Sequence, residues 1–463
     1  MLRFVRRLTS LTSPGVWVIL AIAIASSVAV AVWPVAPSNA TKFWIFAKQH
    51  EAIYSEILAR WNRANQTEPV ELQILSIPVM EQRMMSGFLS ATPVADILEV
   101  ERSIAGRAFT GPIEQVGFVD LTERIKAEGL LEQVNAPSFS PWTSRGHVFG
   151  LPHDVHPVML LYRSDIVEAA GIDVTQIETW DDFFRVMRPL MRDVDGDGRN
   201  DRYLLNLSPA TQSATEVLLL QAGGGMFDLE ERLSVNSPIN AEVLANLVTW
   251  YAGPNRVSSY ADVALSASGQ QVFVDGGVVF VLAPDWVSGR LKQNVPALAG
   301  KVKVMPLPAW SKGGRRTSVW GGTMLGIAKT SRGQSTNWKF AKYVYFSEEV
   351  AAALFRTTGI VTPIKAHWTN PIFDEPDPYF SGQAVGREYL NLAPSVPLRA
   401  SSPFTVQALI EANNCLVQLV NYAERTGQFD AAALIPEAQR LLDGAQRAVQ
   451  AKLARNVFLS PTP

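Results

Sequence analysis

The stretch that decides the fold runs from residue 151 to residue 187 and reads LPHDVHPVMLLYRSDIVEAAGIDVTQIETWDDFFRVM. Its apolar run at residues 159–162 predicts a strand. Thr179 and Asp182 have the spacing of a capping box, which predicts the start of a helix. Aromatic and methionine side chains then recur at helical spacing, and Pro189 predicts that this helix kinks or ends there. A strand followed by an amphipathic helix indicates an α/β fold.

The same alternation extends to both sides of this stretch. Helices are predicted from about Glu51, over residues 338–355 and over residues 431–455, where apolar side chains fall on one helical face. Further strands are predicted at residues 42–46, 70–77, 95–100, 278–282 and 301–307. Strands separated by helices imply crossover connections, so we expect a mainly parallel sheet.

The composition is that of a globular protein with a large core. The chain has 463 residues, of which 47% are hydrophobic and 18% are charged. This length suits two lobes of ordinary size, and the hydrophobic content argues against widespread disorder. The net charge of -2 indicates neither a nucleic-acid partner nor an acidic surface, so we expect no nucleic-acid partner.

Cys415 is the only cysteine of the chain. An intramolecular disulfide and a structural zinc site with several cysteines are therefore excluded. We expect Cys415 to be a buried small hydrophobic residue in a helix rather than a reactive thiol.

The N-terminus has the order of an export signal. Arg3, Arg6 and Arg7 precede an uncharged apolar run at residues 16–33. Basic residues on the leading side keep that end in the cytoplasm and direct the remainder outward. We therefore expect an extracytoplasmic protein, in the periplasm or at the cell surface.

Residues 1–40 are predicted to be either a signal peptide or an N-terminal membrane anchor. Ser38 and Ala40 are small residues at positions -3 and -1 of a cleavage site before Thr41. The apolar run is also about as long as the ~20 residues of a membrane-spanning helix. Both alternatives stay open. A lipid-modified cysteine anchor is excluded, because no cysteine lies directly after the apolar run.

A loop rich in aspartate predicts a structural Ca²⁺ site. Asp193, Asp195 and Asp197 occupy positions 1, 3 and 5 of an EF-hand-like loop, and Asp201 occupies position 9. Carboxylates at alternate positions can converge on one hard cation. Position 12 is Leu204 instead of the usual glutamate, so a plain Asp/Gly turn is the alternative. We expect no cofactor to be required for function.

Several segments, in order, resemble family 1 of the extracellular solute-binding proteins, which contains maltose- and oligosaccharide-binding receptors of ABC importers. The order and spacing hold from about Trp44 to Pro363, whereas residues 373–404 match little of the family pattern. The matching segments are residues 151–154, 159–165, 168–173, 178–183, 273–277, 320–322, 325–328 and 358–363.

This resemblance implies a two-lobed periplasmic-binding-protein fold, type II-like, with interleaved lobes and a central ligand cleft. Residues 41–150 and 306–363 are expected to form the first lobe. Residues 151–305 and 364–463 are expected to form the second lobe. Closure of the lobes about the crossing segments would trap the ligand.

Polar side chains that follow strands are the first group of candidate ligand contacts, because ligands of open α/β sheets bind beyond the carboxyl ends of the strands. Carboxylates, arginine and histidine supply charge-assisted hydrogen bonds to sugar hydroxyls. For each residue, a solvated loop or a structural ion pair is the alternative. The group contains Gln49, His50, Glu51, Glu101, Arg102, His153 and Asp154.

The second group matches family positions near the cleft and contains Trp286, Trp320 and Gly321. An indole face offers a rigid apolar platform to the C–H face of a pyranose ring. The alternative for each tryptophan is an ordinary position in the core.

The resemblance therefore implies a receptor that binds a small solute, expected to be a sugar, as a monomer and delivers it to ABC permease subunits. We expect no catalytic residue. The sequence contains no G-x-S-x-G, H-E-x-x-H or P-loop motif. Two alternatives stay open: an exported carbohydrate-active enzyme that uses two carboxylates, and a membrane-tethered module that senses its ligand.

Overall fold

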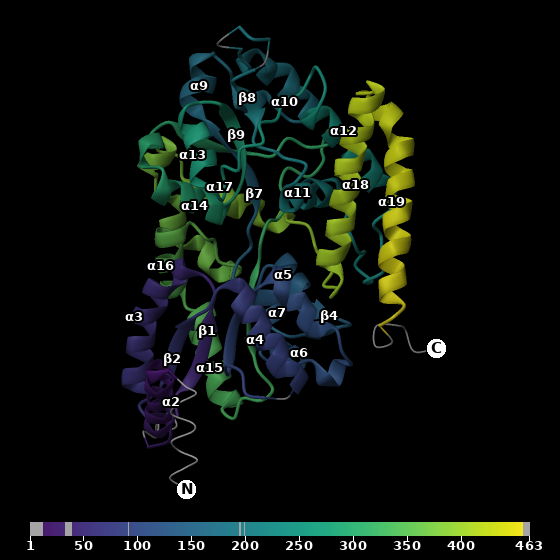
Figure 1. Ribbon diagram of the computed structural model, residues 1–463. Helices are drawn as coiled ribbons and strands as arrows, with labels where there is room; N and C mark the ends of the chain where they lie inside the picture. Colours follow the sequence, from purple (N-terminus) through teal and green to yellow (C-terminus); the bar gives the residue numbers. More distant parts are fainter. Residues whose placement is uncertain (1–12, 33–38, 91, 194–195, 199, 457–463) are drawn as a thin grey trace. The chain divides into compact units, whose positions relative to one another are not determined.

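The computed structural model describes residues 13–32, 39–90, 92–193, 196–198 and 200–456 (Figure 1). The chain divides into two compact units, Met1–Ala40 and Thr41–Pro463. The first unit contains the helix α2 (Pro14–Val32), which has exposed apolar side chains. A search of the described residues finds no helix with the length and hydropathy to span a membrane.

Among the described residues, the second unit contains two large sheets and one sheet of two strands. The first large sheet has five strands in the order β2-β1-β3-β11-β6. Within this sheet β1 pairs in parallel with β2 and β3, whereas β11 is antiparallel to β3 and β6. The strands are β1 (Thr41–Ile45), β2 (Val70–Ile74), β3 (Ile97–Glu101), β6 (Leu151–Pro152) and β11 (Thr323–Ile327).

Helices pack against the first sheet to form the first lobe (Figure 1). Phe43 of β1, for example, contacts Phe340 edge-on, with ring centroids 5.6 Å apart. The elements of this lobe are α3 (Lys48–Ala64), α4 (Ile77–Ser90), α5 (Arg102–Ala105), α6 (Thr122–Ala127), α7 (Leu130–Gln133), α8 (Ala136–Phe139), β4 (Thr143–Ser144), β5 (His147–Val148), α15 (Gln334–Tyr345) and α16 (Glu348–Thr358).

The prediction of one long helix over residues 338–355 was wrong, because the segment is divided between α15 and α16. Ser347 is the N-cap of α16, and its side chain accepts a hydrogen bond from the backbone N–H of Val350. An N-cap serine satisfies a backbone donor that would otherwise lack a partner, so it favours a new helix start at this point.

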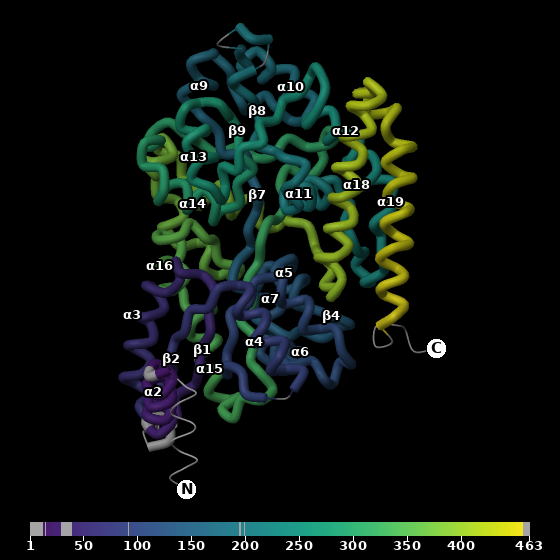
Figure 2. The backbone as a smooth tube through the Cα atoms, in the orientation of Figure 1, coloured from purple at the N-terminus to yellow at the C-terminus, as the bar shows by residue number. Residues whose placement is uncertain are grey.

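The second sheet has four strands in the order β10-β7-β9-β8. The strands are β7 (Val158–Arg163), β8 (Tyr203–Leu205), β9 (Val278–Pro284) and β10 (Val302–Pro306). Only β8 and β9 pair in parallel, because β7 is antiparallel to both β9 and β10. The expectation of a mainly parallel sheet was therefore wrong here. The chain passes from the first lobe to the second along β7 (Figure 2). It returns to the first lobe after β10, which is why β10 runs antiparallel to β7.

The second lobe surrounds this sheet with helices. Its elements are α9 (Ser164–Ala169), α10 (Trp180–Met187), α11 (Gln212–Ala222), α12 (Pro238–Tyr251), α13 (Ala267–Val274), α14 (Asp285–Asn294), α17 (Val385–Leu392), α18 (Thr405–Thr426) and α19 (Ala431–Leu453). The helices α18 and α19 lie side by side and pack against α12 (Figure 1). Cys415 is buried within α18, as predicted.

The capping box is present at the start of α10. Thr179 accepts a hydrogen bond from the backbone of Asp182, and the carboxylate of Asp182 accepts one from the backbone of Thr179. The helix ends at Met187, and Pro189 follows in the 3-10 turn Arg188–Leu190. Both local predictions for this segment are confirmed.

One short strand lies on the other side of the expected boundary. β6 belongs to the first sheet through its pairing with β11, although residues 151–305 were assigned to the second lobe. The physical reason is that backbone pairing continues for two residues beyond Gly150 before the chain crosses to the second sheet.

Candidate functional site

A cavity of about 720 Å³ lies between the two lobes, and we call it the cleft. This volume is within the range of about 300–1,000 Å³ that is usual for ligand pockets. The first lobe contributes the end of β3, the residues that follow β1, the first residues of α3 and α5, and Ile77 of α4. The second lobe contributes α11, α14 and α18. The lining includes Phe46, Gln49, His50, Ile77, Glu101, Arg102, Ser103, His156, Glu216, Trp286, Trp320, Gly321, Ser401, Ser402 and Thr405.

Seven of the ten predicted ligand residues line the cleft: Gln49, His50, Glu101, Arg102, Trp286, Trp320 and Gly321. Three others, Glu51, His153 and Asp154, are absent from the lining. His153 and Asp154 do not reach the cleft because their side chains are buried among other residues. Glu51 is the fourth residue of α3 and lies beyond the helix residues that line the cleft. Contact of any of the ten with a ligand stays a prediction.

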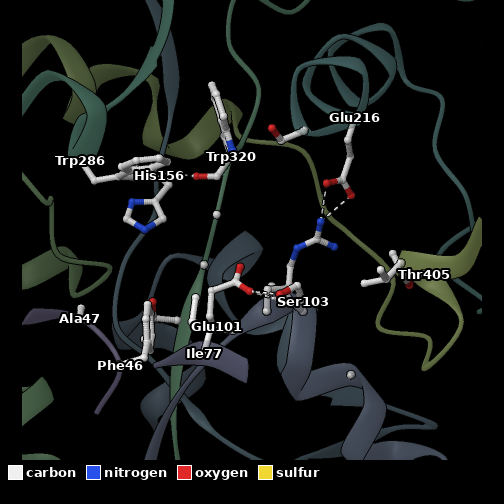
Figure 3. A pocket seen from close by; sticks show the side chains of 18 of the residues that line it. Phe46, Ala47, Ile77, Glu101, Ser103, His156, Glu216, Trp286, Trp320 and Thr405 are labelled. Atoms are coloured by element: carbon white, nitrogen blue, oxygen red, sulfur yellow. Dashed lines mark hydrogen bonds and ion pairs between the residues drawn. The ribbon is translucent and has the colours of Figure 1, made fainter. Parts of the chain in front are cut away.

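Trp286 and Trp320 form an aromatic corner in the cleft (Figure 3). Their rings are 5.7 Å apart and inclined at 80°. The indole nitrogen of Trp286 donates a hydrogen bond of 3.1 Å to the backbone carbonyl of Trp320. Both side chains are half-buried, so each is held by packing while part of its surface faces the cleft. Such a corner can pack against an apolar face of a ligand.

Gly321 is required for the close packing of this corner. Its φ is +94°, and a Cβ would lie 3.2 Å from Cδ2 of His156 and 3.3 Å from Nε1 of Trp286. A side chain at this position would therefore be strained in its backbone and crowded by both rings.

Arg102 and Glu216 form an ion pair across the cleft (Figure 3). Arg102 begins α5 in the first lobe, whereas Glu216 lies on α11 in the second lobe. Their N–O distance is 2.5 Å, and their side chains are 16% and 15% exposed. Burial opposes the charged form of Arg102, but the carboxylates of Glu216 and Glu101 together outweigh it and raise the pKa of Arg102. The pair links the lobes directly.

A buried hydrogen-bond network lies beneath the cleft and is centred on Glu99. Its carboxylate accepts hydrogen bonds from the hydroxyls of Tyr54 at 2.8 Å and Tyr345 at 3.0 Å. His50 Nδ1 lies 2.8 Å from the other carboxylate oxygen. Burial raises the pKa of Glu99, but His50, His153 and Tyr54 together outweigh this effect and lower it. His50 therefore has a structural role as well as a place in the cleft wall.

His156 joins two buried carboxylates at the lobe crossing. Its Nε2 lies 3.0 Å from Asp154, and its Nδ1 lies 2.6 Å from Asp285. Burial disfavours the imidazolium, but the carboxylates of Asp154 and Asp285 raise the pKa of His156 to about 10. Asp285 also accepts a hydrogen bond from the backbone N–H of Val361 at 2.8 Å. A protonated His156 thus ties together three separate segments of the chain.

Several lining residues were missed from the sequence, including His156, Glu216, Ser401 and Ser402. His156 meets its partner Asp285 only in the folded chain, so no local pattern marked it as a cleft residue. The two serines lie within residues 373–404, where the family resemblance fails. That failure was itself a usable indication that the segment carries features particular to this chain.

The described residues contain one group of three side chains with metal-ligand atoms within 4.8 Å of one another: His50, Glu99 and His153. Because Glu99 already accepts two tyrosine hydrogen bonds and contacts His50, we assign this group to the buried network.

The predicted Ca²⁺ loop is only partly described. Asp193 accepts hydrogen bonds from the backbone N–H groups of Gly196 at 2.7 Å and Gly198 at 2.9 Å. Asp197 and Asp201 are among the described residues, whereas Asp195 lies outside them. Ca²⁺ binding by this loop stays a prediction.

Solved structures with the same architecture show the fold. The sugar-binding protein MalE from Xanthomonas citri superposes with a TM-score of 0.69 at 18% identity, over 90% of this chain and 99% of that chain. An ABC transporter solute-binding protein from Thermotoga lettingae, bound with α-D-tagatose, has a TM-score of 0.66 at 17% identity, over 88% and 100%. The chain therefore has the two-lobed periplasmic-binding-protein fold that the sequence predicted.

Sequence relatives agree with this fold. An arabinooligosaccharide-binding protein of Halalkalibacterium halodurans is 25% identical over 347 residues, which cover 73% of this chain and 74% of that protein. A lactose-binding protein of Rhizobium radiobacter is 25% identical over 328 residues, which cover 69% and 73%. The family model described as bacterial extracellular solute-binding protein matches residues 47–351, more than half of the chain. This chain is therefore a member of the bacterial extracellular solute-binding protein family.

Proposed function

We propose that this receptor binds an oligosaccharide outside the cytoplasm and delivers it to the permease subunits of an ABC importer. The observation that carries the proposal is the aromatic corner of Trp286 and Trp320, which faces charged side chains across one cleft. A pyranose ring has apolar C–H faces and a rim of hydroxyls, so it needs both kinds of surface. The names of the arabinooligosaccharide- and lactose-binding relatives support the same class of ligand.

The receptor works by closure of two lobes around its ligand. We assign residues 41–150 and 306–363 to the first lobe and the remainder of residues 151–463 to the second, with β6 as the exception described above. Ligand bound between Trp286 and Glu101 contacts both lobes, and it therefore favours the closed arrangement. Binding is proposed to occur in the monomer and to leave the sugar chemically unchanged.

Residues 1–40 are proposed to direct export of the chain. N-terminal sequencing of protein recovered from the producing cell tests cleavage before Thr41. A mature chain that begins at Thr41 supports a signal peptide, whereas an intact N-terminus in the membrane fraction supports an anchor.

Thermal unfolding of the full chain with a panel of oligosaccharides, monosaccharides, polyols and amino acids tests the function. A ligand at 100 times its Kd adds about 2.7 kcal/mol to the stability of the folded state. We expect stabilisation by one class of saccharide, and chromatography should recover that saccharide intact. A cleaved saccharide would indicate an enzyme, and stabilisation by a non-sugar alone would refute the proposed ligand class.

A matched pair of tryptophan variants links the stabilisation to the cleft. Trp286→Phe should weaken saccharide binding, because the smaller ring provides less stacking surface. Trp310→Phe is the control: Trp310 is also half-buried, but it stacks on Trp250 outside the cleft lining. Equal affinity of the two variants would contradict a role for the aromatic corner.

A further inference from the structure

A second cavity of about 1030 Å³ adjoins the cleft. Four residues line both cavities: Arg102, Glu216, Ala400 and Thr405. The Arg102–Glu216 ion pair therefore stands in the wall that the two cavities share. A ligand longer than the cleft can extend into the second cavity past this pair.

Besides Arg102, three arginines line the second cavity, and their hydrogen-bond acceptors are backbone carbonyls. Arg315 donates to the carbonyl of Leu220 at 3.0 Å, and Arg399 donates to that of Gly321 at 2.8 Å. Arg316 donates to the carbonyls of residues 177 and 307. These bonds hold the guanidinium groups in place, but a carbonyl does not neutralise a cation.

The acidic side chains of the same cavity already have basic partners. Glu216 pairs with Arg102, whereas Asp228 and Glu230 both pair with Arg232. Among the described residues, no such ion pair forms at Arg315, Arg316 or Arg399. The cavity thus has an excess of positive charge.

Arg399 is the strongest part of this evidence, because it is only 7% exposed. Burial lowers the pKa of Arg399 to about 9, and the nearby charge of Arg102 acts in the same direction, whereas Glu216, Asp154 and Glu101 partly oppose it. A buried cation without a direct ion-pair partner is costly, so a bound anion would offset part of that cost. Arginine also matches the planar geometry of a carboxylate and can form two parallel hydrogen bonds with it.

We propose that the second cavity is an anion subsite, which holds a carboxylate or phosphate group of an acidic oligosaccharide whose neutral part occupies the cleft. This inference rests on the proposed function as a saccharide receptor. It makes the ligand class more specific: the transported sugar carries a negative charge near one end. An anion at this position also competes with Glu216 for Arg102.

The location of Arg399 indicates that this specificity is a feature of this chain. Residues 394–400 line the second cavity, and they lie outside residues 47–351, which match the family model. A segment beyond the family match therefore supplies a buried cation of the subsite.

Calorimetric titration of the full chain tests the proposal with uronic-acid oligosaccharides, their methyl esters and neutral oligosaccharides of the same length. The methyl ester removes the charge but keeps the size of the sugar. We expect the acid to bind about tenfold or more tightly than its ester, as charged hydrogen bonds allow. High salt should reduce this preference. A phosphorylated disaccharide, titrated in parallel, distinguishes a phosphate ligand from a carboxylate ligand.

Two variants and a matched control locate the effect. Arg315→Gln and Arg399→Gln should each reduce the preference for the acid over the ester. Lys312→Gln removes the same charge from an exposed position outside the lining, and it should leave the preference unchanged. Arg315 is itself exposed, so its variant should fold even if the variant of buried Arg399 does not.

The outcomes separate this inference from the proposed function. Equal affinity of the wild-type chain for acid and ester, or a stronger preference for neutral sugars, would overturn the anion subsite and leave the sugar receptor intact. A preference for the acid that both arginine variants retain would also overturn it. If no saccharide of any charge binds, the proposed function itself fails.

Discussion

His156 offers a quantitative test of how the lobe crossing is stabilised. We consider His156→Asn, because His156 has a φ of +54° and asparagine tolerates this left-handed conformation. The variant removes the positive charge between Asp154 and Asp285, which are only 5% and 0% exposed. Removing one partner of a buried ion pair costs about 3–5 kcal/mol. A rise in the pKa of His156 from 6.5 to about 10 corresponds to about 5 kcal/mol.

The contribution of His156 should depend on pH in a defined direction. Its pKa is raised in the folded state, so the stabilisation is complete below the ordinary value of 6.5 and is lost as the pH rises toward about 10. Although burial raises the pKa of Asp154, the histidines lower it overall, and its contribution is lost only in strong acid. Urea unfolding of both proteins from pH 6.5 upward should show a difference in free energy of unfolding that narrows with rising pH.

His147→Asn is the control for this experiment. His147 also contacts an aspartate, at 2.6 Å from Asp120, but its side chain is 40% exposed. Exposed ion pairs contribute about 0–1 kcal/mol, so this variant should remain close to the wild type. A loss below about 1 kcal/mol in His156→Asn, or a difference that does not change with pH, would refute a charged His156 at the crossing.

Four further predictions follow from individual contacts. Gly321→Ala should lower the free energy of unfolding by about 1–3 kcal/mol, because its φ of +94° disfavours a Cβ; an unchanged urea midpoint would contradict the close packing. Thr179→Ala should cost about 1 kcal/mol through loss of the capping box, and a loss near zero in urea unfolding would contradict it. Glu216→Gln should weaken the link to Arg102 and increase the radius of gyration of the ligand-free protein in X-ray scattering; an unchanged radius would show that the pair does not hold the lobes. Ca²⁺ should raise the melting temperature of the wild type but not that of Asp193→Asn. A wild-type melting temperature that is the same with Ca²⁺ and with a chelator would refute the Ca²⁺ loop.

Features that depend on neighbouring residues were predictable from the sequence alone. The capping box of Thr179 and Asp182 involves side chains three residues apart, and the buried helical position of Cys415 was expected from the usual behaviour of a free cysteine. The rule that ligands bind beyond strand ends brought Gln49, Glu101 and Arg102 to the cleft wall. Each of these predictions needs only the direction of one element and the period of its side chains.

Only the tertiary structure decided which distant residues meet. His156 and Asp285 are 129 positions apart, and Arg102 and Glu216 are 114 positions apart. Neither pair belongs to a local motif, because Arg102 and Glu216 lie in different lobes and His156 meets the distant Asp285 only where the chain crosses between the lobes. The arrangement of β7 and β10 likewise depends on where the chain crosses between the lobes. The family match and local periodicity thus determined the fold class, whereas the charges of the cleft were set by long-range packing, since side chains far apart in sequence meet only after both lobes have formed.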